Sequence, residues 1–380
     1  MKKHIIIVGA GISGVSIAYH LAIKGVKDIL VLDQGYFTSG ATGRCGAGIR
    51  QQWQTEMNAI MAKKSMEFFE NAEEILGYDG TVELKQEGYL ILATTPEEVK
   101  QFEKNVAMQN KLGIPSKVVS KTEALEIVPH LNKDAFISAT FCPTDGHLNP
   151  FKMTEAFYKA SLNLGVEFHF YEEVKGFKVE EQKVTHVITD KDTYETDIII
   201  NAAGGYAKEI GAMAGVDIPV YSENHEILAT EPVEKIQGPM VMSFSKNIYC
   251  QQVPHGAFLM GRSNPEQEPG HDISSTWQFL DEMSKTVCDI MPLIGKLNIV
   301  RQWGGSYNMS PDHQPIISKA NEISNFYMAC GFSGHGFMLA PMTGLLMSEL
   351  ILGLDPTIDL KALSIDRFKD QEIHIEKSVV

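Results

Sequence analysis

The chain has 380 residues, of which 44% are hydrophobic and 21% are charged, a composition typical of a globular protein with one large core or two smaller ones. Its formal net charge of −15 disfavours nucleic acid or an anionic membrane surface as a partner, because both attract an excess of lysine and arginine. The cysteines are scattered without a CxxC pair, which favours a reduced, cytoplasmic protein with no metal site; they are Cys45, Cys142, Cys250, Cys288 and Cys330.

The first 35 residues predict a strand, a helix and a second strand. The β-branched run HIIIVGA at 4–10 is typical of a strand covered on both faces, VSIAYHLAIKG at 15–25 has helical spacing, and DILVLDQG at 28–35 is a further strand. Such a unit has a right-handed crossover and a parallel sheet. The first apolar run is too short and too soon broken by glycines for a secretory signal.

Glycines at the first turn of this unit follow the dinucleotide-binding pattern. Gly9, Gly11 and Gly14 form G-x-G-x-x-G directly after the strand, and Asp33 closes the second strand. The first glycine permits a tight turn, the second lets the backbone approach a pyrophosphate, and the third lets the helix pack closely on the strand. Asp33 suits a ribose hydroxyl of an adenosine. The pattern predicts a dinucleotide site but does not separate NAD from FAD.

The middle of the chain predicts helices and strands without a repeat or a Pro/Ser-rich linker. Helices are expected over 56–76, 96–113, 122–129 and 150–165, and strands over 87–94, in a run between 166 and 204, and at 197–205. Thr122 is the expected cap of the third helix. Alternating and aromatic stretches across 220–310 favour an antiparallel sheet. We therefore expect domains that share chain crossings.

The stretch NFYMACGFSGHGF at 325–337 predicts a strand, a glycine turn and a helix. Backbone amides at that helix start can face a polar, electron-rich group, which in a flavoenzyme would be the pyrimidine edge of the isoalloxazine. The apolar segment 337–353 contains Pro341, Gly344 and Glu349, and it is too short and interrupted to span a bilayer. We expect a buried helix there.

Three segments, in this order, carry a resemblance to a known family: VGAGISG…LVLDQG, DIIINAAGGYA and SPDHQPII…YMACGFSGHGFMLAP. They resemble the D-amino-acid oxidase superfamily of FAD enzymes, and the tail looks most like the sarcosine oxidase β subunit and the β subunit of dye-linked L-proline dehydrogenase. The resemblance implies an α/β fold. It has a discontinuous Rossmann-like FAD-binding domain (1–85, 140–219 and 301–380) and a mainly antiparallel substrate domain (86–139 and 220–300).

The resemblance also implies that FAD lies against glycine-rich backbone. In related enzymes the loop after the second strand, here GATGRCGAGIRQQW at 40–53, follows the FAD pyrophosphate and passes under the flavin, where small residues, here including Gly43, permit a close approach. The expected cofactor-binding residues are Gly9, Gly11, Gly14, Asp33, Gly40, Thr42, Arg44, Gly46, Gly48, Val174, Ala203, Gly204, Gly331, Gly334, His335 and Gly336.

Oxidation of an amino acid by a flavin needs a neutral amine, a held carboxylate and a C–H bond over flavin N5. Arg50 is the expected carboxylate anchor, because a guanidinium offers two parallel donors and related sarcosine oxidases carry an arginine at the matching position. Arg44 is its competitor, although it suits the pyrophosphate or a carboxylate of the protein better.

Two further residues are expected close to the reacting atoms of the substrate and the flavin. The resemblance implies that Tyr307 lies near the substrate and that His335 lies in the flavin-facing turn, where it can bond or tune the flavin or transfer a proton, or act only structurally. His225, at the start of an expected strand of the substrate domain, is a weaker candidate for a role in the reaction than His335. Cys45 is also weaker, since it has neither a cysteine neighbour nor metal-ligand spacing.

Four positions depart from the pattern of related sarcosine oxidases. Gly305 stands where monomeric enzymes carry the flavin-tethering cysteine, so FAD is expected to bind without a covalent bond there. Met338 replaces a second carboxylate-binding lysine, and Leu259 falls near the oxygen-activating lysine, which favours a dehydrogenase over an efficient oxidase. Pro150 stands where heterotetrameric enzymes tether FMN, which leaves open non-covalent FMN between subunits.

The leading hypothesis is FAD-dependent oxidation of a small amino acid or secondary amine of the sarcosine, proline or glycine type, by hydride transfer to flavin N5, giving an imine. A first alternative is a 2-hydroxy-acid or polyol dehydrogenase, with His335 or His225 as its base. A second is an FAD-binding subunit that is active only in a hetero-oligomeric complex. An NAD enzyme explains only the first forty residues. The expected partners are a small substrate and an electron acceptor or second subunit, with neither nucleic acid nor a membrane span.

Overall fold

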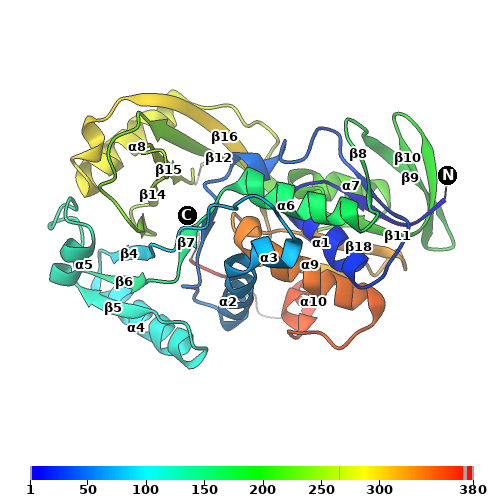
Figure 1. Ribbon diagram of the computed structural model, residues 1–380, viewed down its shortest axis with the longest axis horizontal. Helices are drawn as coiled ribbons and strands as arrows, with labels where there is room; N and C mark the ends of the chain where they lie inside the picture. The colour runs from blue at the N-terminus through cyan, green and yellow to red at the C-terminus, as the bar shows by residue number, and fades with distance from the viewer. Residues whose placement is uncertain (1, 265, 371–374, 379–380) are drawn as a thin grey trace.

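The computed structural model describes residues 2–264, 266–370 and 375–378. Within them, the first of two large sheets has the strand order β17-β18-β11-β1-β2-β8, and β10 and then β9 continue from β11. Strands β9 and β10 lie at the end of the molecule that carries the N-terminus (Figure 1). The strands are β1 (Lys2–Val8), β2 (Ile29–Leu32), β8 (Glu167–His169), β9 (Val174–Glu180), β10 (Lys183–Thr189), β11 (Thr193–Asn201), β17 (Ile316–Lys319) and β18 (Phe326–Cys330). The expected parallel pairing is confirmed, because β1 runs parallel to β2 and β11, and β11 to β18.

The β-branched run of β1 is buried on both faces. Ile5 and Ile7 pack into a core with helices α1 (Ile12–Ile23) and α9 (Gly336–Leu352), whereas Ile6 and Val8 face a second core that includes α7 (Ala207–Met213). Continuous burial explains why this strand shows no polar alternation. Its carboxyl end, followed by the start of α1, lies in the middle of the sheet.

The second large sheet has the order β16-β12-β15-β14-β13-β4-β6-β5 and is antiparallel except where β13 meets β4. Its strands are β4 (Tyr89–Ala93), β5 (Lys117–Ser120), β6 (Ser138–Cys142), β12 (Tyr221–Thr230), β13 (Met240–Ser243), β14 (Ile248–Gln252), β15 (Phe258–Arg262) and β16 (Ile299–Met309). The expected mixture of a Rossmann-like layer and an antiparallel sheet is confirmed. The predicted domain boundaries at 140 and 301 fall inside β6 and β16 and stay a prediction.

Helix α8 (Trp277–Ile290) was not anticipated within 220–310. It covers one face of the second sheet through Phe279, Met283, Val287 and Ile290. This spacing is helical, and Thr276 caps the helix by accepting from the backbone N–H of Phe279 at 3.1 Å. Alternating stretches lie on either side of this helix, so the overall pattern of 220–310 favours a sheet.

The other helices largely follow the predictions. They are α2 (Glu56–Glu70), α3 (Ala72–Leu76), α4 (Pro96–Lys111), α5 (Lys121–Ile127), α6 (Pro150–Asn163) and α10 (Arg367–Asp370). The single helix expected over 56–76 is interrupted at Asn71. Thr122 is not the cap of α5: Ser120 accepts from Glu123 N–H, and the Glu123 carboxylate accepts from Ser120 N–H at 2.8 Å, a reciprocal capping box.

A short two-stranded sheet joins β3 (Gly48–Ile49) to β7 (Gly146–His147) between the larger layers. Throughout the described ranges, no helix is both long and apolar enough to cross a bilayer. The same residues contain no group of three or more side chains placed to hold a metal ion.

Candidate functional site

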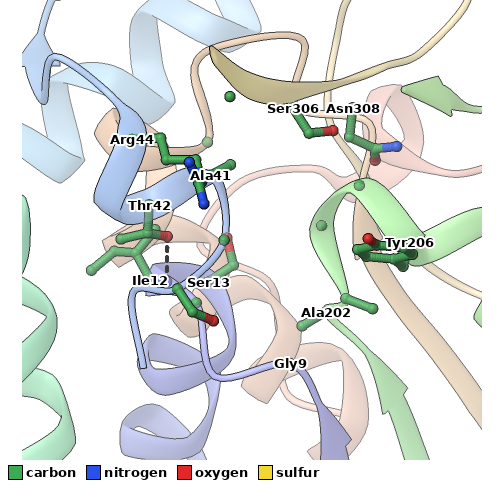
Figure 2. Close-up of a pocket in the computed structure, with 18 of the residues that line it drawn as sticks. Gly9, Ile12, Ser13, Ala41, Thr42, Arg44, Ala202, Tyr206, Ser306 and Asn308 are labelled. Atoms are coloured by element: carbon green, nitrogen blue, oxygen red, sulfur yellow. Dashed lines mark hydrogen bonds between the residues drawn. The ribbon is translucent and has the colours of Figure 1, made fainter. Parts of the chain in front are cut away.

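A cavity of about 500 Å³ lies where the two large sheets meet. Its walls come from the carboxyl ends of β1 and β2, the start of α1, the loop 38–45, the turn after β11, and strands β12, β14 and β16. Figure 2 shows that ten labelled residues surround this space: Gly9, Ile12, Ser13, Ala41, Thr42, Arg44, Ala202, Tyr206, Ser306 and Asn308. Segments far apart in the chain therefore form one chamber.

The glycines of the first turn shape the floor of this cavity. Gly9 has φ +108°, and a Cβ there would collide with the carbonyl oxygen of Ala202; a Cβ on Gly14 would collide with the carbonyl of Gly9. Gly11 precedes α1, and Ile12 N–H donates to the Thr42 hydroxyl at 3.1 Å (Figure 2). The positive end of the α1 dipole opens on the cavity, as an anionic pyrophosphate requires.

Asp33 stands at the cavity wall beside Gly9. Its carboxylate accepts from the backbone N–H groups of Ala10 at 2.7 Å and Gly35 at 2.8 Å. Burial raises the pKa of Asp33, and these two hydrogen bonds oppose the rise. The side chain is held in place and still borders the cavity, so its predicted contact with a ribose stays open to test.

The other predicted cofactor-binding residues divide between two cavities. Those lining the large one are Gly40, Thr42, Arg44, Val174, Ala203, Gly204, Gly334 and Gly336. Gly46, Gly48 and His335 line a smaller cavity of about 80 Å³ instead. Gly331 lines neither cavity, and its N–H donates to the Asn308 side-chain oxygen at 2.6 Å.

Three residues that line the large cavity carry buried polar atoms with no partner among the described residues. Both ring nitrogens of His225, the Ser306 hydroxyl and the Asn308 amide nitrogen find no hydrogen-bond partner within the described residues, and all three residues line the cavity. Unmet buried polar groups of this kind mark a site for a polar ligand. The glycine turn, the helix start and these donors fit FAD. Ser306 and Asn308 flank Tyr307 in β16, the only sequence signal that could have found them.

Arg50 lies in the smaller cavity and is almost completely buried. Its guanidinium donates to the carbonyl oxygens of Gln52 at 3.0 Å and Ser378 at 2.6 Å, and it lies 4.0 Å from the centre of the Trp53 ring. Its Nε has no partner in the part of the chain that the structure describes. The cation therefore has donors left over for a ligand.

Two buried carboxylates act on Arg50 from a distance. Burial lowers the pKa of Arg50, and the charges of Glu376 and Asp145 oppose that change. Asp145 accepts from Gln51 N–H at 2.8 Å and from the Gln52 amide at 2.9 Å, but burial outweighs these bonds and raises its pKa to about 6. Among the described residues, neither carboxylate makes a direct ion pair with Arg50.

The two cavities share a wall. Cys45, Tyr249, Tyr307, Gly334 and Phe337 line both of them. A ligand held by Arg50 would therefore lie next to a ligand in the large cavity. The geometry joins the anion-binding residue that the sequence predicted to the predicted dinucleotide chamber.

The candidate histidines are neutral near pH 7. Burial lowers the pKa of His335 to about 3 and that of His225 to about 3. The Nδ1 of His335 lies 3.1 Å from the Ser333 carbonyl oxygen, which assigns the proton to Nδ1 and leaves Nε2 as an acceptor that has no partner in the described part of the chain. His225 stacks on Tyr307 with ring centres 4.1 Å apart, and burial keeps the Tyr307 hydroxyl protonated by raising its pKa.

The remaining sequence candidates take smaller roles in the geometry. Cys45 donates to the Thr42 carbonyl at 3.1 Å, and burial raises its pKa to about 11, so it stays a thiol. Gly305 borders the large cavity and packs against Arg44, Met338 borders the small one, and Leu259 borders neither. The Trp303 indole donates to the Arg44 carbonyl at 2.9 Å and fixes that loop on β16.

The arrangement can hold an anionic group beside a redox cofactor. FAD in the large cavity would supply the acceptor for a hydride, with Gly9, Gly11 and the α1 start along its pyrophosphate. Arg50 would bind the anionic group, and the aromatic walls would exclude water.

Comparisons with known proteins agree with this geometry. A family model described as FAD dependent oxidoreductase matches residues 4–350. The dimethylglycine dehydrogenase of Rattus norvegicus is 27% identical over 389 residues, which cover 97% of this chain and 45% of that protein. Sarcosine oxidase subunit beta of Rhodobacter capsulatus is 25% identical, covering 100% of this chain and 91% of that subunit.

The same resemblance holds in three dimensions. The crystal structure of L-proline dehydrogenase from P. horikoshii superposes with a TM-score of 0.92 and 38% identity, covering 97% of this chain and 98% of that one. This chain spans about half the length of the dimethylglycine dehydrogenases but nearly all of the other two proteins. With the fingerprint, the chamber and a family match over most of its length in agreement, the chain belongs to the FAD-dependent oxidoreductase family.

Proposed function

We propose that this protein oxidises a small amino acid or secondary amine with FAD that it binds without a covalent bond. The observation that carries the proposal is Arg50, a buried cation with unused donors in a cavity that shares a wall with the predicted FAD chamber. Among the described residues this buried guanidinium has no carboxylate partner, a costly arrangement that a substrate carboxylate would relieve.

Four residues of the small cavity have a part in the proposed reaction. Arg50 binds the carboxylate, and Tyr307 and Phe337, in the shared wall, set the position of the substrate carbon toward the larger chamber. His335 offers Nε2 as an acceptor for an amine N–H, because its other nitrogen is bound to Ser333. No strong base is needed, since a neutral amine already carries the lone pair that assists loss of a hydride.

The comparisons support the choice of substrate class. The L-proline dehydrogenase matches at 38% identity over nearly the whole chain, and sarcosine oxidase subunit beta matches over 100% of this chain and 91% of its own length. Proline, sarcosine and glycine are therefore the first substrates to try. The walls of the small cavity carry no second cation among the described residues, which suits an acid with one carboxylate.

Oxidation of a hydroxy acid has less support. Removing the hydroxyl proton requires a base with a pKa near the working pH. Burial lowers the pKa of both His335 and His225 to about 3, which makes them weak bases at neutral pH.

A second candidate function is that of an FAD-binding subunit in a larger complex. The match to a protein named as a subunit beta favours it. The edge strand β16 exposes Ile299 and Val300, and Trp277 at the start of α8 is 84% exposed; exposed apolar side chains of this kind are compatible with a partner. Full turnover by the isolated chain would rule out this dependence.

The five free cysteines further support a reducing, cytoplasmic setting.

The test is reduction of the yellow holoprotein by amino acids without oxygen. Proline, sarcosine or glycine should bleach the flavin bands, and Arg50→Met should raise the half-saturating concentration at least about tenfold, the loss of one charge-assisted interaction. Arg301→Met, in an exposed part of β16, is the control and should change nothing. Absence of bleaching by every amine, or an unchanged half-saturation in Arg50→Met, contradicts the proposal.

A further inference from the structure

The segment Ile375–Ser378 forms part of the wall of the Arg50 cavity. Ser378 lines the cavity, is nearly inaccessible to solvent, and places its carbonyl oxygen 2.6 Å from a terminal nitrogen of Arg50. Because the guanidinium also bonds to the Gln52 carbonyl, its plane is fixed from two sides by backbone atoms. The anchor's direction therefore depends on where this segment sits.

Glu376 holds the segment in place through a fully buried carboxylate. One oxygen accepts from Thr55 N–H at 2.9 Å, from the Thr55 hydroxyl at 2.8 Å and from the Asn58 amide at 3.3 Å. The other accepts from Ser378 N–H at 2.9 Å. The contact chain thus runs from α2 through Glu376 and Ser378 to Arg50.

If Glu376 only stabilised the start of α2, it would not need its hydrogen bond to Ser378. Thr55 is the N-terminal cap of α2, so a negative charge beside it is favourable without any tie to Arg50. Yet the same carboxylate also binds the residue whose carbonyl meets the guanidinium, and the Glu376 N–H donates to the Asp312 carbonyl at 2.9 Å. The segment is therefore held by hydrogen bonds to Thr55 on one side and to Asp312 on the other, and it places Ser378 at the cavity.

We propose that Glu376 is a positioning residue that holds Ile375–Ser378 against the cavity. The segment thereby orients the Arg50 guanidinium, and Ser378 forms a wall that restricts the site to small carboxylates. This inference rests on the proposed function, because it takes Arg50 as the substrate anchor. The other walls include the large side chains of Trp53, Tyr89 and Met338, and the enclosed space is about 80 Å³. Loosening the segment would open the site beside the anchor and admit bulkier acids.

The experiment compares two non-reactive monocarboxylates, propionate and cyclohexanecarboxylate, whose binding to the holoprotein is followed by the change in flavin absorbance. The measured quantity is the ratio of their dissociation constants. Both ligands carry one negative charge, so the loss of the Glu376 charge cancels in the ratio. In Glu376→Gln we expect the ratio of the cyclohexanecarboxylate dissociation constant to the propionate dissociation constant to fall about tenfold, which is the size of the selectivity that the shape of an apolar pocket gives.

Glu349 provides the matched control. It is also buried, and it accepts from Thr357 N–H at 2.8 Å and from the Thr357 hydroxyl at 2.6 Å, the same pattern without a link to Arg50. Glu349→Gln should leave the ratio unchanged. If Glu376→Gln does not fold, Thr55→Val against Thr357→Val removes one hydroxyl donor from each glutamate and should give the same contrast, more weakly.

The outcomes separate this inference from the function beneath it. If both acids bind and the ratio is unchanged in Glu376→Gln or Thr55→Val, the positioning role is overturned while the carboxylate site stands. If the ratio also falls in the Glu349 or Thr357 variants, the effect is general loss of stability and the inference is again overturned. If neither acid binds the wild-type protein, the proposed carboxylate site fails and this inference fails with it.

Discussion

Arg50 shows how single residues combine into a site that local sequence reveals only in part. Arg50 is predicted as a carboxylate anchor because a guanidinium offers paired donors and because related sarcosine oxidases carry an arginine at the matching position, and this role stays a prediction. Asp145 and Glu376, which set its electrostatic surroundings, were not predicted, because they come from segments with no shared motif. Contacts between distant segments are fixed by the fold, and a single sequence carries no local pattern for them.

Asp145 should make stability depend on pH. Its folded pKa of about 6 lies above the ordinary 3.8, so the stabilising form is the protonated one. That contribution is complete below about pH 4 and is lost as pH rises through about 6. Relative to Asp145→Asn, the wild-type unfolding free energy should fall by roughly 2 kcal/mol between pH 4 and pH 7. Urea unfolding across this range measures it.

The exposed Asp134 supplies a control for the Asp145 experiment. Asp134→Asn should show the same pH profile as the wild type. A constant difference between wild type and Asp145→Asn at every pH would mean that the carboxyl group is not perturbed by burial.

At the scale of elements, periodicity and glycine spacing predict the β1-α1-β2 unit, β4, the strands between 166 and 204, β18, α9 and an antiparallel region over 220–310, but not β5, β6 or β17. These two signals fail where a stretch of sequence fits two structures equally well. The apolar positions of α8 repeat every three or four residues, but they lie among alternating strands, so the helix was overlooked. The cap of α5 was misplaced by two residues, because Ser120 and Thr122 are both good caps and only the reciprocal bond with Glu123 decides between them.

The crossing of α1 and α9 behind the FAD chamber depends on Gly344. A Cβ there would meet the Ser16 carbonyl oxygen at 2.6 Å and the His20 ring at 2.6 Å. Alanine favours a helix over glycine by about 1 kcal/mol, but the collision forces the helices apart. We expect Gly344→Ala to lower the unfolding free energy by about 1–3 kcal/mol, an overpacking cost.

Denaturant unfolding of the holoprotein tests this, with Gly270→Ala as the control, because a Cβ on Gly270 meets no atom within 4 Å. A Gly344→Ala protein as stable as the wild type would show that the two helices can separate freely.

At the scale of the molecule, the FAD chamber joins the two sheets. Gly9 and Ala203 approach it from the first sheet, whereas His225, Tyr249 and Tyr307 approach it from the second. A ligand that contacts both walls binds the folded protein and not the unfolded chain, so it stabilises both layers together. This explains why the motif residues are spread over most of the chain and why the buried polar atoms of β12 and β16 have partners missing among the described residues.

Gly9→Ala should uncouple FAD from this stabilisation. Adding FAD to the wild-type apoprotein at 100 times its dissociation constant should stabilise it by about 2.7 kcal/mol. In Gly9→Ala, the φ of +108° strains an alanine and its Cβ meets the Ala202 carbonyl, so the turn must move away from the pyrophosphate. The melting temperature of this variant should therefore rise less at the same FAD concentration, whereas Gly270→Ala should match the wild type. An equal rise in Gly9→Ala would mean that FAD does not depend on this turn, and the chamber would then need another anchor for the cofactor.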